Sequence, residues 1–433
     1  MFDRSGTPAD SPAHELALGC LEAGIDAAHP RQAVARHCSV DEDDGTLTVR
    51  DATYDLSAYD SVLLVGGGKA ADDLAVAFEA LLGDRLSGGV VVTDERTADP
   101  DRVDVLEGEH PTPGDGSVAG ARAVLNRAAA ATDRTLVIGA IAGGGSALLC
   151  APAAGLSVDD LQAVTDGLLD AGASIDEINA VRRACSSIKG GGLAAAAKPA
   201  TVLGILVSDV VGGDPSVIAS GPTVPIGTDP EAALEVLARY GVDLPAVESF
   251  LHESAPEAPA DVDVDTHVVA SGRDAIDAAA EHASSLGYRT CVLSTRIEGE
   301  ATAAGRVHAA IAAEAADSGD PVEPPAAILS GGETTVRVTG DGTGGPNGEF
   351  ALAAAMDLPA PAVLGAVDTD GGDGSTDAAG ALVDAGTVDD PAAARAALSD
   401  NDSYTFLDSR GALLRSGATG TNVNDLRVLV VPA

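Results

Sequence analysis

The chain has 433 residues and a formal net charge of −42, and its acidic residues are spread through amphipathic segments. This length allows two domains with a hydrophobic core, which must consist mainly of Ala, Val, Leu and Ile because there is no Trp. The acidic balance excludes nucleic acid as a partner, since phosphate backbones bind basic surfaces. The first residues do not resemble a leader, and no apolar run approaches about 18 residues. We expect a soluble, cytoplasmic protein without a membrane partner, as a monomer or homodimer.

Lysine is scarce in this chain. The chain has only three lysines, Lys69, Lys189 and Lys198, and many more arginines. A dispersed acidic surface with few lysines is typical of a halophilic protein from a salt-rich cytoplasm, where screening weakens the repulsion between like charges. Two of the three lysines lie next to triple glycines, so each of these two is a candidate for a specific role.

The hydrophobic pattern predicts helices and strands in alternation. Residues 1–12 are polar and contain proline, so we expect them to be disordered. A helical pattern follows at 14–40, and the capping box Ser174-x-x-Glu177 starts a later helix. Short apolar runs that predict buried strands occur at 62–65, 90–93, 136–138 and 203–207. This alternation indicates an α/β protein with a Rossmann-like, doubly wound, mostly parallel sheet.

A stretch rich in Pro, Ala and Glu divides the chain. We predict an N-terminal Rossmann-like domain at 13–250, a linker at 251–265 and a second α/β domain at 266–433. Strands of the second domain are expected at 266–270, 290–294, 326–329 and 363–367, with a closing strand at the end of the chain.

Two glycine-rich loops follow predicted strands of the first domain. Gly66, Gly67 and Gly68 precede Lys69, and backbone N–H groups with a neighbouring ammonium suit an anion. The loop is not a P-loop, and a tight turn with a solvated lysine explains it equally well. Gly143, Gly144, Gly145 and Ser146 form the second loop, where three glycines favour close approach of a phosphate or carboxylate. Lys69 is the first catalytic candidate and Lys189 a weaker one, because a cation near a helix end is ordinary.

Carboxylates and hydroxyls follow the strand at 203–207. Asp209 and Asp214, with Ser220 nearby, could hold Mg²⁺ or take the proton of an attacking hydroxyl. In a chain with 67 acidic residues, any one Asp is more often a surface residue. Only their position at a strand end makes Asp209 and Asp214 better candidates than the others. The same argument applies to Asp370, Asp373 and Asp377 in the second domain, which we assign to substrate binding together with Ser220 and Arg182.

Nine sequence blocks together resemble one known family. They include GGGKAA at 66–71, GGGSALLCAP at 143–152, SDVVGGDPSVIASGPTVP at 208–225 and TDGGDGSTDAAGA at 369–381. In their order, from about residue 60 to 430, they are similar to the glycerate 2-kinase family, whose C-terminal half is the MOFRL domain. The resemblance implies ATP-dependent phosphorylation of D-glycerate to 2-phosphoglycerate with Mg²⁺, in a cleft between two α/β domains.

The resemblance also implies that Lys69 matches the catalytic lysine of the family. The residues by themselves make Asp209 and Lys189 further catalytic candidates, and Asp209 and Asp214 candidate metal ligands. Nucleotide-binding candidates are Gly66, Gly67, Gly68, Gly143, Gly144, Gly145, Ser146, Ser330, Gly331, Gly332, Glu333, Thr334 and Asn347.

The chain departs from the family pattern at two positions. Pro346 stands where the family usually has an arginine that stabilises the transferred phosphate, and Gly192 stands where arginine is frequent. Another arginine (Arg182, Arg183, Arg273 or Arg337) could supply the charge, or stabilisation of the phosphate could depend more on Lys69 and Mg²⁺.

Two alternative functions stay open. One is a hydroxypyruvate reductase. The GGGKAA loop is evidence against it, because the loop lacks the third glycine of a dinucleotide-binding fingerprint. The other is a regulator that binds a phosphorylated ligand without turnover.

Overall fold

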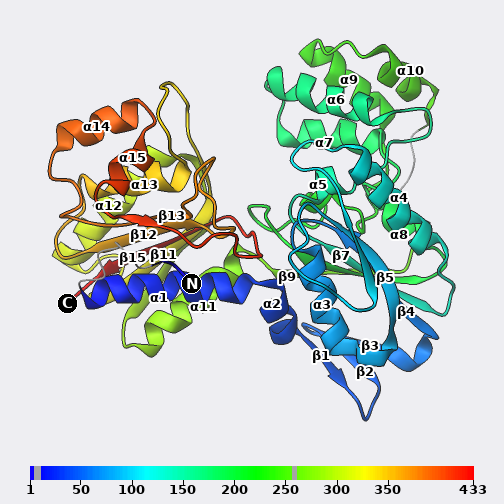
Figure 1. Ribbon diagram of the computed structural model, residues 1–433, viewed down its shortest axis with the longest axis horizontal. Helices are drawn as coiled ribbons and strands as arrows, with labels where there is room; N and C mark the ends of the chain where they lie inside the picture. The colour runs from blue at the N-terminus through cyan, green and yellow to red at the C-terminus, as the bar shows by residue number, and fades with distance from the viewer. Residues whose placement is uncertain (4–10, 256–260) are drawn as a thin grey trace. The chain divides into compact units, whose positions relative to one another are not determined.

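The computed structural model describes residues 1–3, 11–255 and 261–433, and its chain divides into two compact units (Figure 1). The parallel-sheet unit comprises Ala33–Val269. The mixed-sheet unit comprises Met1–Gln32 together with Ala270–Ala433. Each unit is an α/β body with its own sheet, which confirms the predicted fold class.

The parallel-sheet unit is built on a six-stranded sheet with the order β6-β5-β4-β7-β8-β9, in which each pair from β6 to β8 is parallel. A small antiparallel sheet, β1-β2-β3, accompanies it. Its strands are β1 (Cys38–Asp41), β2 (Thr46–Val49), β3 (Ala52–Asp55), β4 (Ser61–Gly67), β5 (Leu86–Thr93), β6 (Val103–Glu107), β7 (Thr135–Ile141), β8 (Thr201–Val207) and β9 (Val264–Ala270).

Helices cover both faces of this sheet. Helices α4 and α8 share a core with Val65, Val92 and Val137, and α3 packs on the other face (Figure 1). Helices α6, α7, α9 and α10 form a separate hydrophobic cluster. The helices are α2 (Pro30–His37), α3 (Ala71–Leu82), α4 (Asp115–Ala129), α5 (Gly145–Leu148), α6 (Val158–Asp170), α7 (Ile175–Ala184), α8 (Gly192–Ala196), α9 (Pro230–Tyr240) and α10 (Pro245–Glu253), with short 3₁₀ turns η1 (Leu56–Ala58), η2 (Gly83–Arg85) and η3 (Ile218–Ser220). The capping box predicted at Ser174 and Glu177 is confirmed at the start of α7.

The mixed-sheet unit contains a second six-stranded sheet, ordered β10-β11-β15-β12-β13-β14. Only β10 and β11 are parallel, and the other pairs are antiparallel. Its elements are α1 (Pro12–Ala28), α11 (Gly272–Ser285), β10 (Arg289–Glu300), α12 (Ala301–Ser318), β11 (Ala326–Thr335), α13 (Pro346–Ala355), β12 (Val363–Asp368), β13 (Gly380–Asp384), α14 (Pro391–Ser399), α15 (Ser403–Asp408), β14 (Leu413–Leu414) and β15 (Asp425–Val431).

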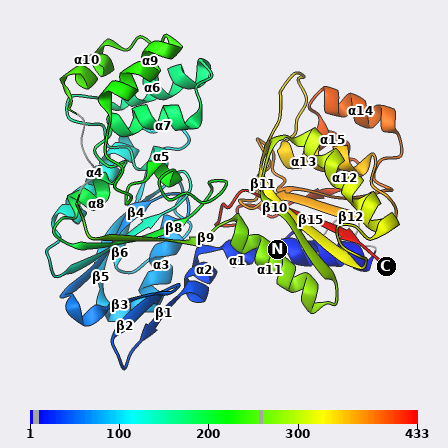
Figure 2. The same ribbon diagram turned by 180° about the vertical axis from the view of Figure 1, so that it is seen from behind.

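Strand β15 shows how this sheet serves two cores. Its Val428 and Val430 belong to the core beneath α1 and α11, whereas Leu429 and Val431 belong to the core beneath α12 and α13. Because successive side chains of a strand point to opposite faces, one apolar run fills both cores. Figure 2 shows α1 and α11 on one side of the sheet and α12 and α13 on the other. The unit is therefore a three-layer α/β/α body.

The structure moves two predicted boundaries. The helical pattern at 14–40 is two helices, α1 and α2, and α1 packs against α11 and β15 in the mixed-sheet unit. An amphipathic pattern predicts a buried face but does not say which partner buries it. The predicted linker at 251–265 also shrinks, because α10 extends to Glu253 and β9 starts at Val264. Residues 256–260 of that linker lie outside the described residues.

The predicted disorder of residues 1–12 is wrong where the structure describes them. Phe2 is buried in the core beneath α1, Asp3 forms a β-bridge with Arg415, and α1 starts at Pro12. Residues 4–10 lie outside the described part of the chain. Among the described residues, no helix is long and apolar enough to cross a membrane.

The packing of α1 predicts a long-range effect of a core substitution. Leu21 on α1 is fully buried in the mixed-sheet core, so Leu21→Ala should lower the free energy of unfolding by about 2–5 kcal/mol. Hydrogen exchange should rise in β12 and β15 more than in β4 and β7. Leu169→Ala, at a position 58% exposed on α6, is the control and should change stability by less than about 0.5 kcal/mol. Faster exchange confined to β4 and β7 would contradict the assignment of α1.

Candidate active site

The strand order of the parallel sheet turns around between β4 and β7. The chain places β5 and β6 on one side of β4, and then β7 and β8 on the other. Such a switch point, at the carboxyl ends of the strands, is where open α/β sheets bind ligands. The loops that leave β4 and β7 carry Lys69 and the glycines at 143–145. The sequence-predicted loops thus come together at one edge of one sheet.

The backbones of these two loops touch. The Lys69 N–H donates to the Gly143 carbonyl over 2.9 Å, and the Ala142 N–H donates to the Gly67 carbonyl over 3.1 Å. A Cβ at Gly144, which has φ +76°, would lie 3.2 Å from Lys69 Cγ and 3.2 Å from His110 Cδ2. Lys69 and His110 therefore border the second glycine loop.

Asp209 lies beside the same loop. A Cβ at Gly143 would be 2.4 Å from Asp209 Oδ2, so only glycine lets the carboxylate come this close. Burial raises the pKa of Asp209, and the Gly144 N–H and the positive charge of Lys69 act in the opposite direction. A carboxyl group with a raised pKa is better suited to accept a proton near neutral pH.

A chain of hydrogen bonds between buried polar side chains holds the 143–146 loop in place. Lys189 Nζ donates to the Ser146 carbonyl over 2.8 Å. The Ser146 hydroxyl is 3.0 Å from the Ser220 hydroxyl, which lies 3.3 Å from Asn179 Oδ1. Lys189, Ser220 and Asn179 are all buried. The predicted residues Lys189, Ser146 and Ser220 are therefore joined in one network.

Two other predicted residues of this unit have different surroundings. Arg182, on α7, donates through Nε to Thr165 Oγ1 over 3.1 Å and lies close enough to Lys189 to lower the pKa of that lysine. Asp214 is exposed, and its Oδ1 accepts the Ser216 N–H over 2.9 Å. Asp214 thus stabilises the turn in which it lies, and none of its described contacts joins it to Asp209.

The glycine-rich run at 330–334 is not a loop. Strand β11 continues through it to Thr335. The Ser330 hydroxyl is 2.8 Å from His308 Nε2, and the Thr334 N–H donates to Asp425 Oδ2 over 2.9 Å. A Cβ at Gly332 would lie 2.2 Å from the Ile297 carbonyl oxygen of the adjacent strand. The nucleotide-binding candidates Ser330, Gly331, Gly332, Glu333 and Thr334 therefore lie in a strand, where the glycines permit close packing, and their role in nucleotide binding stays a prediction.

Predicted polar residues of the mixed-sheet unit meet around the start of α13. Asn347 Nδ2 donates to Asp425 Oδ1 over 2.7 Å, and the Asn347 and Gly348 N–H groups donate to the Asp373 carboxylate over 2.8 and 2.7 Å. Arg427 is fully buried and pairs with Asp425. These contacts satisfy the start of α13 and one nitrogen of Arg427, whereas Arg427 Nε, Arg427 Nη1 and Asn347 Oδ1 are buried without a hydrogen-bond partner among the described residues.

The other two predicted aspartates of this unit have contacts of their own. Asp370 Oδ1 accepts the Gly372 N–H over 2.8 Å. Asp377 accepts the Tyr404 hydroxyl over 2.6 Å and lies near Arg415. Tyr404 and Arg415 thus account for the position of Asp377 without a substrate.

The position expected to carry arginine is the first residue of α13, where Pro346 fits because its missing N–H is not needed. Among the four suggested substitutes, Arg273 pairs with Asp277 over 2.8 Å on the surface, whereas Arg182 and Arg183 both lie near Lys189 and its turn in the parallel-sheet unit. Arg427 and Asn179 were not among the residues predicted from the sequence. A charged residue within the apolar run of β15 was the available signal for Arg427.

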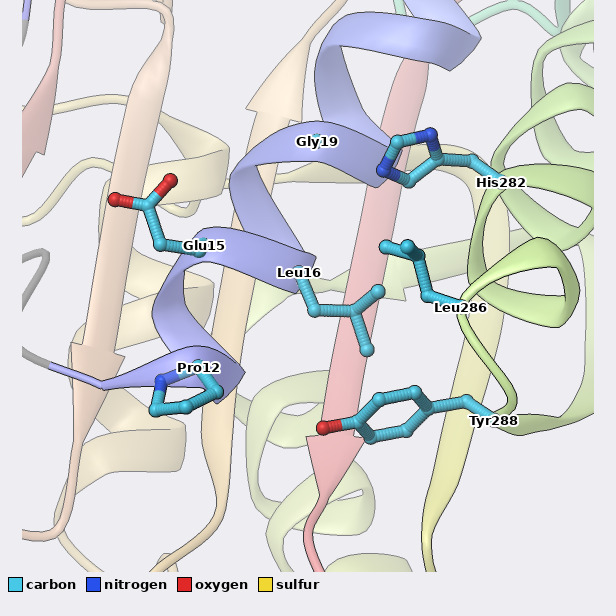
Figure 3. A pocket seen from close by; sticks show the side chains of 7 residues that line it. All are labelled: Pro12, Glu15, Leu16, Gly19, His282, Leu286 and Tyr288. Carbon is cyan, nitrogen blue, oxygen red and sulfur yellow. The ribbon is translucent and has the colours of Figure 1, made fainter.

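A separate pocket lies in the mixed-sheet unit. It has a volume of about 470 Å³ and is lined by α1 and α11, with Leu16, Leu286, Tyr288, Glu15 and His282 around it (Figure 3). It contains none of the predicted site residues. Among the described residues, no group of three or more His, Cys, Asp or Glu side chains is arranged to hold a metal ion.

Comparisons with known proteins agree with this arrangement. A family model described as a domain of unknown function (DUF4147) matches residues 16–252, and the MOFRL family model matches 326–425. A D-glycerate 2-kinase from Thermotoga maritima is 38% identical over 379 residues, which cover 85% of this chain and 90% of the relative. The crystal structure of glycerate kinase from Thermotoga maritima has a TM-score of 0.86 and 35% identity, covering 96% of this chain and 99% of that chain. This chain belongs to the glycerate kinase family.

One relative carries a different name. A protein from Agrobacterium vitis described as a putative hydroxypyruvate reductase is 42% identical over 385 residues, covering 85% of this chain and 87% of the relative. Membership of the glycerate kinase family confirms the resemblance seen in the sequence. The first family match starts at residue 16, within α1, so the region defined by sequence includes a helix that packs in the mixed-sheet unit.

The buried carboxylates of the mixed-sheet unit predict a pH dependence. Burial raises the pKa of Asp373 to about 6, so the folded unit holds a proton that the unfolded chain loses near pH 4. Stability should therefore fall as the pH rises from about 4 to 6, by at most about 1.4 kcal/mol per pH unit for this group.

Asp373→Asn should flatten that fall, because Asn stands in for the neutral acid. Asp368, whose pKa burial and Asp370 also raise, should retain part of the slope. Asp317→Asn, on an exposed position of α12, is the matched control and should leave the slope unchanged. Denaturant unfolding at each pH measures the slope of stability against pH. An Asp373→Asn slope equal to that of the unmodified chain would contradict the role of Asp373 in this pH dependence.

Proposed function

We propose that this chain is an ATP-dependent glycerate 2-kinase that converts D-glycerate to 2-phosphoglycerate. The observation that carries the proposal is the switch point between β4 and β7, where Lys69, the 143–146 loop and Asp209 converge in a member of the glycerate kinase family. Phosphoryl transfer depends on positioning and on neutralising charge. An ammonium, a glycine loop and a carboxylate at one strand edge are suited to that task.

Each group would have a separate role in the reaction. Lys69 would neutralise charge on the transferred phosphoryl group. Asp209 would accept the proton of the glycerate 2-hydroxyl as its oxygen bonds to the γ-phosphorus of ATP. The bond from that phosphorus to the oxygen bridging to the β-phosphate would break, and ADP would leave with the electron pair. The 143–146 loop would hold an anionic group of a substrate through its N–H groups.

Mg²⁺ is part of this proposal because kinases use it to neutralise phosphate charge. Magnesium is usually held by one or two carboxylates together with phosphate oxygens and water, and not by a complete protein cage. Asp209 lies beside the glycine loop, so it would be the protein ligand if another group took the proton of the substrate hydroxyl. Asp214 is exposed and bound to its own turn, which makes it a weaker choice.

A hydroxypyruvate reductase is the second candidate, and one observation favours it. The loop after β4 lacks the third glycine of a dinucleotide fingerprint, but it reads Gly66-x-Gly68-x-x-Ala71, and some fingerprints have alanine at the third position. Asp94 directly follows β5, where the ribose-binding acid of such sites lies. The kinase has stronger support because named glycerate kinases match along the whole chain and because Lys69 occupies the centre of the loop.

Replacing Lys69 tests the proposed role. Lys69→Ala should reduce kcat for ADP release with D-glycerate and ATP by at least about 100-fold, as loss of a single charge-stabilising donor does in other enzymes. The fold should persist, since Lys69 contributes to the loop through its backbone N–H. Lys198→Ala, at an exposed position, is the control and should keep full turnover. A Lys69→Ala variant with more than half of the original kcat would remove Lys69 from the mechanism.

The acidic surface supports a proposal about solution conditions. With a net charge of −42, repulsion among surface carboxylates should destabilise the fold at low ionic strength, where the screening length is long. We expect the Tm to rise by at least about 5 °C between 0.1 and 2 M KCl. The increase should shrink near pH 4.5, close to the sequence pI of about 4.2. A Tm independent of KCl at pH 7 would contradict a halophilic adaptation.

A further inference from the structure

Lys189 is a buried amine that forms no ion pair with a carboxylate among the described residues. The residue is 4% exposed. Its Nζ donates to the Ser146 carbonyl over 2.8 Å. None of the ion pairs among the described residues includes Lys189. A buried charge without a counter-charge is costly, so its retention in a fold indicates a use.

Of the two groups that face Lys189, one increases this cost. They are the Arg182 guanidinium from α7 and the Cys150 thiol that follows α5. Burial and the positive charge of Arg182 lower the pKa of Lys189 to about 7, and Cys150 acts weakly in the opposite direction. Asp166 is the acid that faces Arg182. Two cationic side chains thus lie close enough for their charges to repel, and an anion bound near them would relieve that repulsion.

Lys189 also sits at the centre of a rigid backbone arrangement. The turn that carries it donates from Gly190 N–H to the Ser220 carbonyl over 3.0 Å and from Gly191 N–H to the Gly221 carbonyl over 2.7 Å. Ser220 has φ +63°, a left-handed conformation that is uncommon outside glycine and frequent at functional sites. Ser220 in turn bonds the Ser146 hydroxyl. Both the side chain and the backbone near Lys189 therefore fix Ser146.

We propose that Lys189 is a positioning residue for an anionic substrate group, which it serves by fixing the Ser146 backbone and by placing a positive charge behind the 143–146 loop. The group is either the carboxylate of glycerate or a phosphate of ATP, since both are anions of the size that the loop would bind. This inference rests on the proposed kinase function. It predicts that Lys189 acts on substrate affinity more than on the chemical step.

The test compares Lys189→Met and Lys189→Arg in the full chain. We would measure kcat, the KM for D-glycerate and the KM for ATP from pH 6 to 8.5. Lys189→Met should raise one of the two KM values about 10-fold, which corresponds to about 1.4 kcal/mol, with a much smaller change in kcat. Which KM rises identifies the anion. Lys189→Arg keeps a charge and should recover most of the affinity.

The pH profile separates this role from a merely structural one. The KM of the unmodified enzyme should rise as the pH passes through about 7, because Lys189 loses its charge there, whereas the KM of Lys189→Met should be flat. Lys198→Met is the matched control and should behave as the unmodified enzyme. Lys189→Met should unfold at the same or a higher temperature, because an apolar residue replaces a buried charge.

Failure of this inference differs from failure of the proposed function. If the unmodified chain turns over and Lys189→Met keeps both KM values within twofold and the same pH profile, the positioning role is overturned. If the unmodified chain does not turn over, the kinase proposal fails, and calorimetric titration with ATP and with D-glycerate then tests Lys189 by itself. Weaker binding of one ligand to Lys189→Met supports the inference, and equal binding, or none to the unmodified chain, overturns it.

Discussion

The close approach of the backbones of β4 and β7 is the constraint on which the proposed site depends. A Cβ at Gly66 would lie 1.9 Å from the Ala140 carbonyl oxygen, and one at Gly68 would lie 2.5 Å from the Ala142 carbonyl oxygen. Any larger residue at either position would push the strands apart. Because the strands stay together, the Lys69 N–H reaches the Gly143 carbonyl and the two loops share one edge. The glycines at 66–68 thus allow the close backbone packing that brings the two loops of the proposed site together, independently of any ligand.

The mixed-sheet unit depends on a different interaction, a buried polar network around Asp425. Its carboxylate accepts from Thr334 and Asn347 and pairs with the fully buried Arg427. The Arg427 guanidinium also lies 4.7 Å above the Phe350 ring. Such a network fixes the relative positions of β11, β15 and α13 because each partner left unpaired would be costly. Asp373 adds the start of α13 to the same assembly.

The sequence predicted the strands and loops of the parallel sheet because buried parallel strands are short apolar runs with clear ends. Lys69, Asp209 and Ser146 became candidates for that reason, and they lie at the carboxyl ends of these strands. The roles of Ser330 and Thr334 could not be predicted, since glycines required by strand packing and glycines required by a ligand look the same in a sequence. Arg427 was overlooked because a charge inside an apolar run gives no indication of its partner. The unit to which α1 belongs also depends on contacts between segments far apart in the chain.

Phosphorus NMR of the reaction product tests the central claim most directly. The full chain would be incubated with D-glycerate, ATP and Mg²⁺ in molar KCl, with a parallel sample containing hydroxypyruvate and NADH. The account predicts the resonance of 2-phosphoglycerate together with ADP in the first sample and no oxidation of NADH in the second. Folded protein that gives no phosphorylated glycerate would contradict the account, and oxidation of NADH would identify the reductase instead.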